Sequence, residues 1–220
     1  MLRSERFFQA VALPYDLVTR QPVWELDCAR MASELPPGCR LVMDLGCGPG
    51  NSATHLRDRI PDVVGIDHAK AMLHRARLRD ARLLLVRGDA RCVPLRDGSV
   101  DAVTFHSVLY LLPDRAAALR ETARVLRPGG RVVLLEPQDV APAAPRKNHS
   151  FWAAGTGLLR ALRRPRWAVT VLLWRTVSGF YGRFSREELR LLLETAGLRV
   201  LKLEDALGGL GLLAVAERPA

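Results

Sequence analysis

The feature that most constrains this chain is a glycine-rich turn that follows a short apolar run. The nine residues VMDLGCGPG, 42–50, predict a buried strand that ends in a turn, with Asp44 just before the alternating glycines Gly46, Gly48 and Gly50. Glycine permits positive φ and lets a ligand approach the backbone closely. Open α/β sheets bind nucleotides at turns after the carboxyl ends of parallel strands. The segment therefore predicts a nucleotide or nucleoside site at the end of a strand.

The spacing of these glycines restricts the class of ligand. GxGxG differs from the GxGxxG of dinucleotide-binding turns, and no GK[ST] follows it for a phosphate-cradling loop. A nucleoside without phosphates fits better, although a tight strand-to-helix turn without a ligand is the structural alternative. DLGCGPG resembles motif I of the class I S-adenosylmethionine-dependent methyltransferases, and the chain is similar to their type 11-like or UbiE-like small-molecule members. The resemblance implies S-adenosyl-L-methionine as the cofactor.

Length and composition permit a single domain over residues 1–220. A chain of 220 residues can bury about 70% of its unfolded surface, and 49% hydrophobic residues are typical of a globular protein. The start MLRSERFFQA lacks an uninterrupted apolar core, and the cysteines, at 28, 39, 47 and 92, lack CxxC spacing. We therefore expect no secretory signal, metal site or disulfide framework, and a cytoplasmic location.

Strand-like and helix-like segments alternate after a helical lead-in over residues 1–38. Such alternation predicts right-handed crossovers and a doubly wound sheet. Asp114 is the expected N-cap of the helix before PGG, residues 128–130, which we expect to close that helix. The expected strands are Leu41–Leu45, Val63–Ile66, Leu83–Val86, Val100–Phe105 and Arg131–Leu135, and the expected helices are Asn51–Arg59, Lys70–Arg79 and Arg115–Leu126.

The end of the chain predicts one more helix and a strand hairpin. Ser185 and Glu188 form a capping box before LRLLLETAG, and Gly197 is suited to the C-cap. Two strands follow, Arg199–Leu203 and Leu210–Ala216. This ending resembles the last strands of the methyltransferase fold, which implies an α/β, doubly wound, seven-stranded, Rossmann-like sheet with its last strand antiparallel. The cofactor-binding core would span 39–137 and the final helix and hairpin 185–220.

Asp67 ends the second predicted strand, about twenty residues after the glycine turn, where an acid can reach a ribose. Its carboxylate can accept hydrogen bonds from both ribose hydroxyls, and its charge repels an attached phosphate. The alternative role is the N-cap of the next helix. Its position after DLGCGPG favours the ribose role, with His68 and Met72 beside the nucleoside. Met72 also has the spacing of an ordinary core residue.

The family resemblance implies roles for further cofactor-binding residues. In GDARCVPLRDGSVDAV, Asp89 would accept from the adenine amine and the N–H of Ala90 would face the ring, although a solvated turn acid is the alternative. Around the methionine end, the resemblance implies that Gly46, Cys47 and Gly48 wrap the methionine and that Asp44 supports the ammonium. It also implies that the Phe105 carbonyl faces the same end and that the aromatic residue Tyr15 closes the site.

Methyl transfer requires mainly that a nucleophile be aligned with the methyl carbon and sulfur, and orientation of this kind can supply about 7–11 kcal/mol. A general base is useful when the acceptor must lose a proton. His106, after the fourth strand, is the candidate catalytic base, with Tyr110 behind it, although a lone histidine beside an apolar strand is more often structural. No NPPY or DPPY tetrapeptide is present, which makes methylation of a nucleobase less favoured.

A basic segment, residues 138–184, departs from the minimal pattern. It holds eight basic residues against Asp139 alone, so it carries +7 of the chain's net charge of +10. The segment predicts two helices broken near Pro165, and in the resembled family such additions form a lid over the acceptor. A helical pair with a solvated arginine face, a membrane-surface contact and RNA binding are the alternatives. Its aromatic residues include Phe151, Trp152, Trp167, Trp174, Phe180 and Tyr181.

We therefore predict S-adenosylmethionine-dependent methyl transfer to a small hydrophobic or anionic acceptor held under a helical lid insertion after the fifth strand, with O-methylation slightly favoured. Nucleic acid is a less favoured partner. The first alternative is a peripheral-membrane methyltransferase that acts on a lipid or prenylated quinone at an anionic membrane. The second is a non-catalytic module whose bound cofactor stabilises a partner complex.

Overall fold

The computed structural model describes residues 3–20, 22–139 and 165–220. It contains a seven-stranded sheet in the order β3-β2-β1-β4-β5-β7-β6. Neighbours from β3 to β5 are paired parallel, whereas β7 runs antiparallel to both β5 and β6. The predicted fold class is confirmed. The strands are β1 (Leu41–Leu45), β2 (Asp62–Asp67), β3 (Leu84–Arg87), β4 (Val100–His106), β5 (Leu126–Pro137), β6 (Arg199–Ala206) and β7 (Gly211–Glu217).

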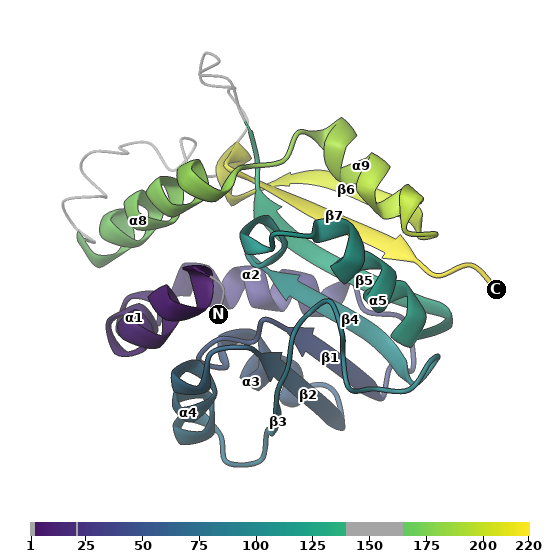
Figure 1. Cartoon of the computed structure of the whole chain (residues 1–220), viewed down its shortest axis with the longest axis horizontal. Coiled ribbons are helices and arrows are strands. Elements are labelled where there is room, and N and C mark those ends of the chain that lie inside the picture. The colour runs from purple at the N-terminus through teal and green to yellow at the C-terminus, as the bar shows by residue number, and fades with distance from the viewer. Residues whose placement is uncertain (1–2, 21, 140–164) are drawn as a thin grey trace.

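Helices cover both faces of this sheet (Figure 1). One face packs against α5 and α9, and the other against α2, α3 and α4. Successive strand residues point to opposite faces, so Val42 enters the cluster with α3 while Met43 enters the cluster with α5. The helices are α1 (Arg3–Thr19), α2 (Pro22–Ser33), α3 (Asn51–Arg57), α4 (Lys70–Arg79), α5 (Arg115–Val125), α8 (Pro165–Tyr181) and α9 (Arg186–Thr195), with short 3₁₀ helices η1 (Leu109–Leu111) and η2 (Leu207–Gly209).

Helix boundaries follow the expected capping residues. The Asp114 side chain accepts a hydrogen bond from the Ala117 N–H at 2.8 Å, and Ser185 accepts from the Glu188 N–H at 3.0 Å. The reciprocal half of the capping box is replaced, because the Glu188 carboxylate pairs with Arg115 at 3.2 Å. Gly197 has φ +80°, as a C-terminal glycine should.

The expected role of the PGG segment as the stop of α5 was wrong, although the end of the helix differs from the expected one by a single residue. The helix stops at Val125, and the PGG segment lies inside β5, which begins at Leu126. The pairing of β4 with β5 shifts register between Val100 and Ala102, and Gly129 has φ +75° there. The glycines therefore form an irregularity at the start of the strand rather than a helix stop.

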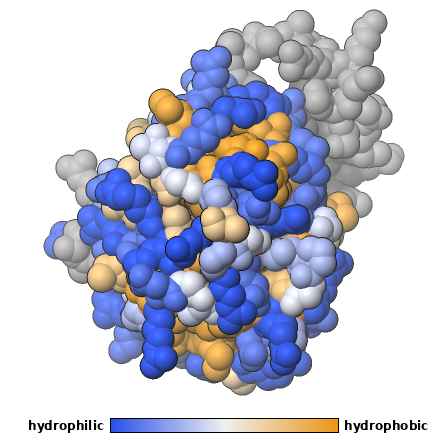
Figure 2. Space-filling view, turned by 90° about the vertical axis from the view of Figure 1, so that its right-hand side faces the viewer, coloured by the Kyte–Doolittle hydropathy of each residue, from blue (hydrophilic) through white to orange (hydrophobic). Residues whose placement is uncertain are grey.

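The carboxyl ends of the parallel strands meet α1 and α8, which lie together on the left of Figure 1. The opposite side of the molecule, shown in Figure 2, is mostly hydrophilic, with one hydrophobic area in its upper half and smaller ones below. In the described part of the chain, every helix is too short or too polar to cross a bilayer. The features that bear on function lie on the left side, where β1, β2 and β4 end.

Candidate functional site

The main cavity opens where β1, β2 and β4 end, and its empty volume is about 780 Å³ including its open mouth. Ligand pockets commonly have about 300–1,000 Å³. Segments far apart in the sequence meet here, since α1 supplies two aromatic residues, and the 3₁₀ helix η1 and the residue after it supply Leu111 and Leu112. The lining residues are Phe8, Tyr15, Leu45, Gly46, Gly48, Ile66, Asp67, His68, Ala69, Met72, Gly88, Asp89, Ala90, His106, Ser107, Val108, Leu111 and Leu112.

The glycine turn forms one wall of this cavity. Gly46, Gly48 and Gly50 all have positive φ, at +72°, +52° and +85°, so each uses a conformation that costs other residues free energy. The Gly46 N–H donates to the Ile66 carbonyl at 2.7 Å and thereby ties the turn to β2. A Cβ at Gly46 would collide with the side chain of Val108. Glycine is therefore required here both for conformation and for space.

Asp67 lies at the end of β2 and lines the cavity. Its carboxylate accepts hydrogen bonds from the Gly48 N–H at 2.9 Å and from the Ala69 N–H at 2.8 Å. Burial raises the pKa of Asp67 more than these two hydrogen bonds lower it. The side chain thus joins the glycine turn to the start of α4 while it remains on the cavity wall, so the two roles considered from the sequence are compatible.

Most other residues expected to bind the cofactor also line this cavity, among them Tyr15, His68, Met72, Asp89 and Ala90. Burial, with the charge of Asp67, raises the pKa of Tyr15 to about 12, so its hydroxyl stays protonated. Asp89 pairs with Arg91 at 2.6 Å, and this hydrogen bond lowers the Asp89 pKa.

Three expected residues lie outside the main cavity. Cys47 lines a smaller side cavity instead. Asp44 lines neither cavity, because its buried carboxylate points to Thr104, whose hydroxyl donates to it at 2.7 Å. Burial raises the pKa of Asp44 to about 7, although this hydrogen bond by itself lowers it. The Phe105 side chain is fully buried in the core, so only its backbone carbonyl is left for the role implied by the resemblance.

His106 lines both cavities and is half-buried. Its Nδ1 lies 2.9 Å from the Ser52 hydroxyl and 3.6 Å from the Cys28 thiol, and its ring packs edge-on against Trp24 at 4.7 Å. Its Nε2 has no hydrogen-bond partner among the described residues. Burial lowers the pKa of His106 to about 4, so the imidazole is neutral near pH 7.

The side cavity lies next to the glycine turn and has an empty volume of about 350 Å³. It shares Tyr15, Gly46, Gly48 and His106 with the main cavity, so those residues form the boundary between the two. Its other lining residues are Thr19, Trp24, Cys47, Pro49, Asn51 and Ser52. The sequence did not indicate Trp24 or Ser52, because a tryptophan inside a lead-in helix and a serine after a glycine turn match no recognised motif.

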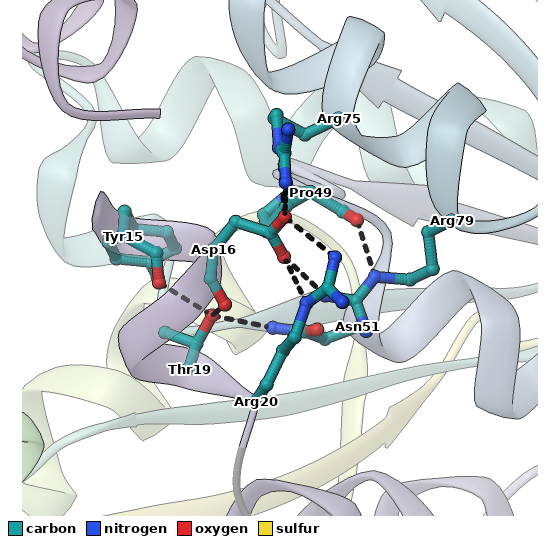
Figure 3. A network of polar contacts seen from close by, with 8 residues as sticks. All are labelled: Tyr15, Asp16, Thr19, Arg20, Pro49, Asn51, Arg75 and Arg79. Carbon is teal, nitrogen blue, oxygen red and sulfur yellow. Dashed lines mark hydrogen bonds and ion pairs between the residues drawn. The ribbon is translucent and has the colours of Figure 1, made fainter. Parts of the chain in front are cut away.

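A buried ion cluster attaches α1 to the glycine turn (Figure 3). The Asp16 carboxylate, fully buried, pairs with Arg20 at 3.0 Å, with Arg75 at 2.7 Å and with Arg79. Burial alone would raise the Asp16 pKa, but hydrogen bonds from Arg20 and Arg75 and the charge of Arg79 together lower it. Arg79 also donates to the Pro49 carbonyl at 2.9 Å. Three cations around one carboxylate leave two positive charges in excess beside the side cavity.

Helix α8 contacts the mouth of the main cavity through one tryptophan. The indole N–H of Trp174 donates to the Ser107 hydroxyl at 3.2 Å. Ser107 has φ +60°, a strained value for a residue other than glycine, and such strain is concentrated at functional sites. Helix α8 corresponds to the second of the two helices expected in this segment, whereas the first expected helix, with Phe151 and Trp152, and the expected break before Pro165 lie outside the described residues.

Residues 43–134 match the family model described as a methyltransferase domain. A demethylmenaquinone methyltransferase from Roseiflexus sp. is 34% identical over 67% of this chain and 66% of its own length. A trans-aconitate 2-methyltransferase from Methylobacterium radiotolerans is 38% identical over 61% of this chain and 51% of its own length. The chain therefore spans less than two thirds of the length of these curated relatives.

Solved structures show the same fold at low identity. A methyltransferase in complex with the Haloferax volcanii Trm112 methyltransferase activator has a TM-score of 0.72 and 22% identity, over 97% of this chain and 98% of its own. The [4+2]-cyclase SpnF has a TM-score of 0.73 and 17% identity, over 99% of this chain and 96% of its own. The matched residues, 43–134, form a methyltransferase domain of the class I S-adenosylmethionine-dependent type. Since one fold serves a methyltransferase and a cyclase alike, the activity has to be argued from the site.

Proposed function

We propose that this chain transfers a methyl group from S-adenosylmethionine to a small, largely hydrophobic acceptor. The observation that carries the proposal is the composition of one cavity, which combines a glycine turn, two carboxylates at Asp67 and Asp89, and an apolar wall. The polar half suits a nucleoside, and the apolar half suits an acceptor that has little charge of its own.

The residues present fit the cofactor. Asp67 and Asp89 are acceptors for hydroxyl and amine donors, and both lie on the cavity wall. Asp67 uses each oxygen for one backbone N–H, and an ionised carboxylate offers about four acceptor positions, so it can still accept from a ribose. Near the methionine end, buried polar atoms of Trp24 and His106 have no partner in the part of the chain that the structure describes. Unpaired groups of this kind are costly unless a ligand or water satisfies them.

The sulfonium of S-adenosylmethionine supplies an activated methyl group when it is bound. The protein has to orient the acceptor and exclude water, and orientation can supply about 7–11 kcal/mol of the barrier. His106 lies at the boundary of the two cavities. Its low pKa keeps it neutral, so it adds no charge that would repel a sulfonium. A base with a pKa of about 4 is poorly matched to neutral pH, which favours orientation over proton abstraction; catalysis by His106 stays a prediction.

The acceptor side is expected at the apolar wall. Phe8 from α1 and Val108, Leu111 and Leu112 from the segment after β4 line the cavity there. Trp174 from α8 bonds to Ser107 beside them. This wall supports a hydrophobic acceptor better than an anionic one. O-methylation stays the prediction made from the sequence.

A lipid or prenylated quinone at a membrane surface is the second candidate acceptor. Several relatives are named demethylmenaquinone methyltransferases. Helices α1 and α8 also expose large apolar side chains, with Leu13 at 52%, Leu172 at 67% and Phe180 at 84% of their surface. Such side chains on a basic protein can contact anionic lipid.

The experiment is incubation of the full chain with methyl-labelled S-adenosylmethionine and a metabolite extract, followed by mass spectrometry of labelled products. The Asp67→Ala variant serves as the control with impaired cofactor binding. Parallel reactions contain anionic vesicles with a demethylated quinol. Label in an extract product supports the small acceptor, and label in the quinol supports the second candidate. Tight cofactor binding without any labelled product would indicate the non-catalytic module instead.

A further inference from the structure

The apolar wall of the main cavity depends on a short segment, residues 107–112, that follows β4. Its first residue, Ser107, has the strained φ of +60°. The middle of the segment is η1, a single 3₁₀ turn, and such turns have weak internal hydrogen bonds. Leu109 and Tyr110 point into the core. Three other side chains of the segment line the cavity, those of Val108, Leu111 and Leu112. Contacts from other elements therefore have to fix the position of this wall.

Glu136 of β5 supplies such contacts from the neighbouring strand. Its side chain is fully buried. The carboxylate accepts three backbone hydrogen bonds, from the N–H groups of Val108 at 3.0 Å, Leu109 at 2.9 Å and Tyr110 at 3.2 Å. The first N–H groups of a helical turn have no partner within the turn, and Val108, at the N-cap, provides no side-chain hydrogen bond. Glu136 therefore caps η1 from another strand.

The position of Glu136 is costly unless its contacts are made. A buried carboxylate is unfavourable without hydrogen bonds or a paired charge. Burial raises the pKa of Glu136 to about 7, although the three N–H groups and the charge of Arg115 lower it. An apolar side chain would avoid this cost, but it would leave the three N–H groups without their acceptor. The carboxylate and the segment that it holds therefore stabilise each other.

Arg115, at the start of α5, holds the carbonyl side of the same segment. Its guanidinium donates to the Tyr110 carbonyl at 3.3 Å and to the Tyr181 carbonyl, at the end of α8, at 3.0 Å. It also lies over the Phe184 ring, 4.6 Å from the centroid. Charged side chains from two other elements thus fix both the N–H and the carbonyl of Tyr110, and one of them also binds α8.

We infer that Glu136 is a positioning residue for the methyl acceptor, because it sets where the cavity-lining side chains of 107–112 lie relative to the cofactor. The inference rests on the proposed function. Glu136 lines neither of the two cavities described above, so it acts through the backbone of the segment. The glycine turn is tied separately to β2 through Gly46 and Ile66. Loss of the carboxylate should therefore loosen the acceptor side and leave the cofactor side in place.

The test measures the two sides of the cavity separately with the full chain. N-phenyl-1-naphthylamine, an uncharged aromatic probe that fluoresces in apolar surroundings, represents the acceptor. Its dissociation constant is measured on protein saturated with S-adenosylhomocysteine at about pH 8, where most of the Glu136 carboxyl is ionised. Calorimetry measures S-adenosylhomocysteine alone. We expect Glu136→Gln, which keeps the size of the side chain but replaces one acceptor oxygen by a donor, to weaken the probe about 10-fold. The S-adenosylhomocysteine constant should change by less than about 2-fold.

Two control variants establish what the probe reports. Asp101→Asn is the matched control, since the Asp101 carboxylate also accepts two backbone N–H groups, those of Arg40 and Leu41, both at 2.9 Å. These N–H groups lie at the start of β1, away from the cavity. Asp101→Asn should lower stability in urea without changing the probe constant. Leu111→Ala removes part of the apolar wall and should weaken the probe, which would show that the probe binds there.

Retained binding of S-adenosylhomocysteine shows that Glu136→Gln is folded. Glu136→Asp keeps the charge but withdraws it by one methylene, so it should show the same selective loss in milder form if Glu136→Gln does not fold. Unchanged probe binding in both variants would overturn the inference, and so would equal weakening of probe and S-adenosylhomocysteine. Failure of the unmodified protein to bind only the probe would overturn the apolar acceptor side, whereas failure to bind S-adenosylhomocysteine would overturn the proposed function itself.

Discussion

Replacing Gly46 by alanine tests whether the glycine turn requires the space that it occupies. Gly46 has φ +72°, and a Cβ there would lie 2.5 Å from Cγ2 of Val108 and closer still to Cγ1. A left-handed conformation costs an L-residue about 1–2 kcal/mol, and overpacking typically costs about 1–3 kcal/mol. We therefore expect Gly46→Ala to lower the free energy of unfolding by about 2–5 kcal/mol.

Two further variants separate these contributions in urea denaturation followed by circular dichroism. Gly129→Ala is the matched control, since Gly129 has φ +75° and a Cβ there meets nothing within 4 Å; it should cost only about 1–2 kcal/mol. Adding Val108→Ala to Gly46→Ala removes the two closest methyl groups. The double variant should therefore be more stable than the sum of the single effects predicts, by about 1–3 kcal/mol.

Two results would refute the reasoning about Gly46. One is a loss in Gly46→Ala no larger than that in Gly129→Ala, which would show that the collision with Val108 is relieved at no cost. The other is strict additivity of Gly46→Ala and Val108→Ala, which would show that the two side chains do not interact. Either result would mean that the segment after β4 does not limit the space available to the glycine turn.

Three further predictions concern charged and titratable groups. Asp67→Ala should weaken S-adenosylhomocysteine binding about 10- to 150-fold in calorimetry, because hydrogen bonds to a charged group contribute about 1.5–3 kcal/mol; unchanged affinity would remove the ribose role. His106→Ala should lower kcat about 100-fold or more if the imidazole acts as a base, and an unchanged kcat in the labelled-methyl assay would remove that role. Burial raises the pKa of Asp27 from 3.8 to about 7, so the folded state holds this proton more tightly and stability should fall as pH rises through that window. Asp27→Asn should flatten the fall between about pH 4 and pH 7 by about 3 kcal/mol in urea titrations, and parallel pH profiles of the two proteins would contradict this.

Much of the sheet could be predicted from the sequence because local patterns and tertiary structure agree there. The predicted bounds of β1 and α4 match those in the structure, and Asp114 and Ser185 cap helices as their residue types suggest. The prediction for the PGG segment was wrong because the same residues suit both a helix stop and a strand irregularity. Pairing with β4 decides between them, and this pairing is not visible in the local sequence.

The residues of the candidate site likewise fall into those that the sequence could predict and those that it could not. The glycine turn and Asp67 have a motif with a defined spacing, and both line the cavity. Asp44 belongs to the same motif, yet its contact with Thr104 from β4 arises only when the strands pair. Trp24 and the Asp16 cluster depend on how α1 and α2 pack on α3 and α4, so no spacing along the chain could reveal them.

This division bears on how acceptor choice is encoded. A demethylmenaquinone methyltransferase and a trans-aconitate 2-methyltransferase both match this chain, although their names give different acceptors. A shared core that binds one cofactor cannot by itself distinguish such acceptors, because the cofactor contacts are common to both. The apolar wall of the cavity comes partly from α1 and η1, with Trp174 of α8 bonded to Ser107. Because α1 and α8 lie outside residues 43–134, we expect changes in these two helices to alter the acceptor while the glycine turn and Asp67 stay as they are.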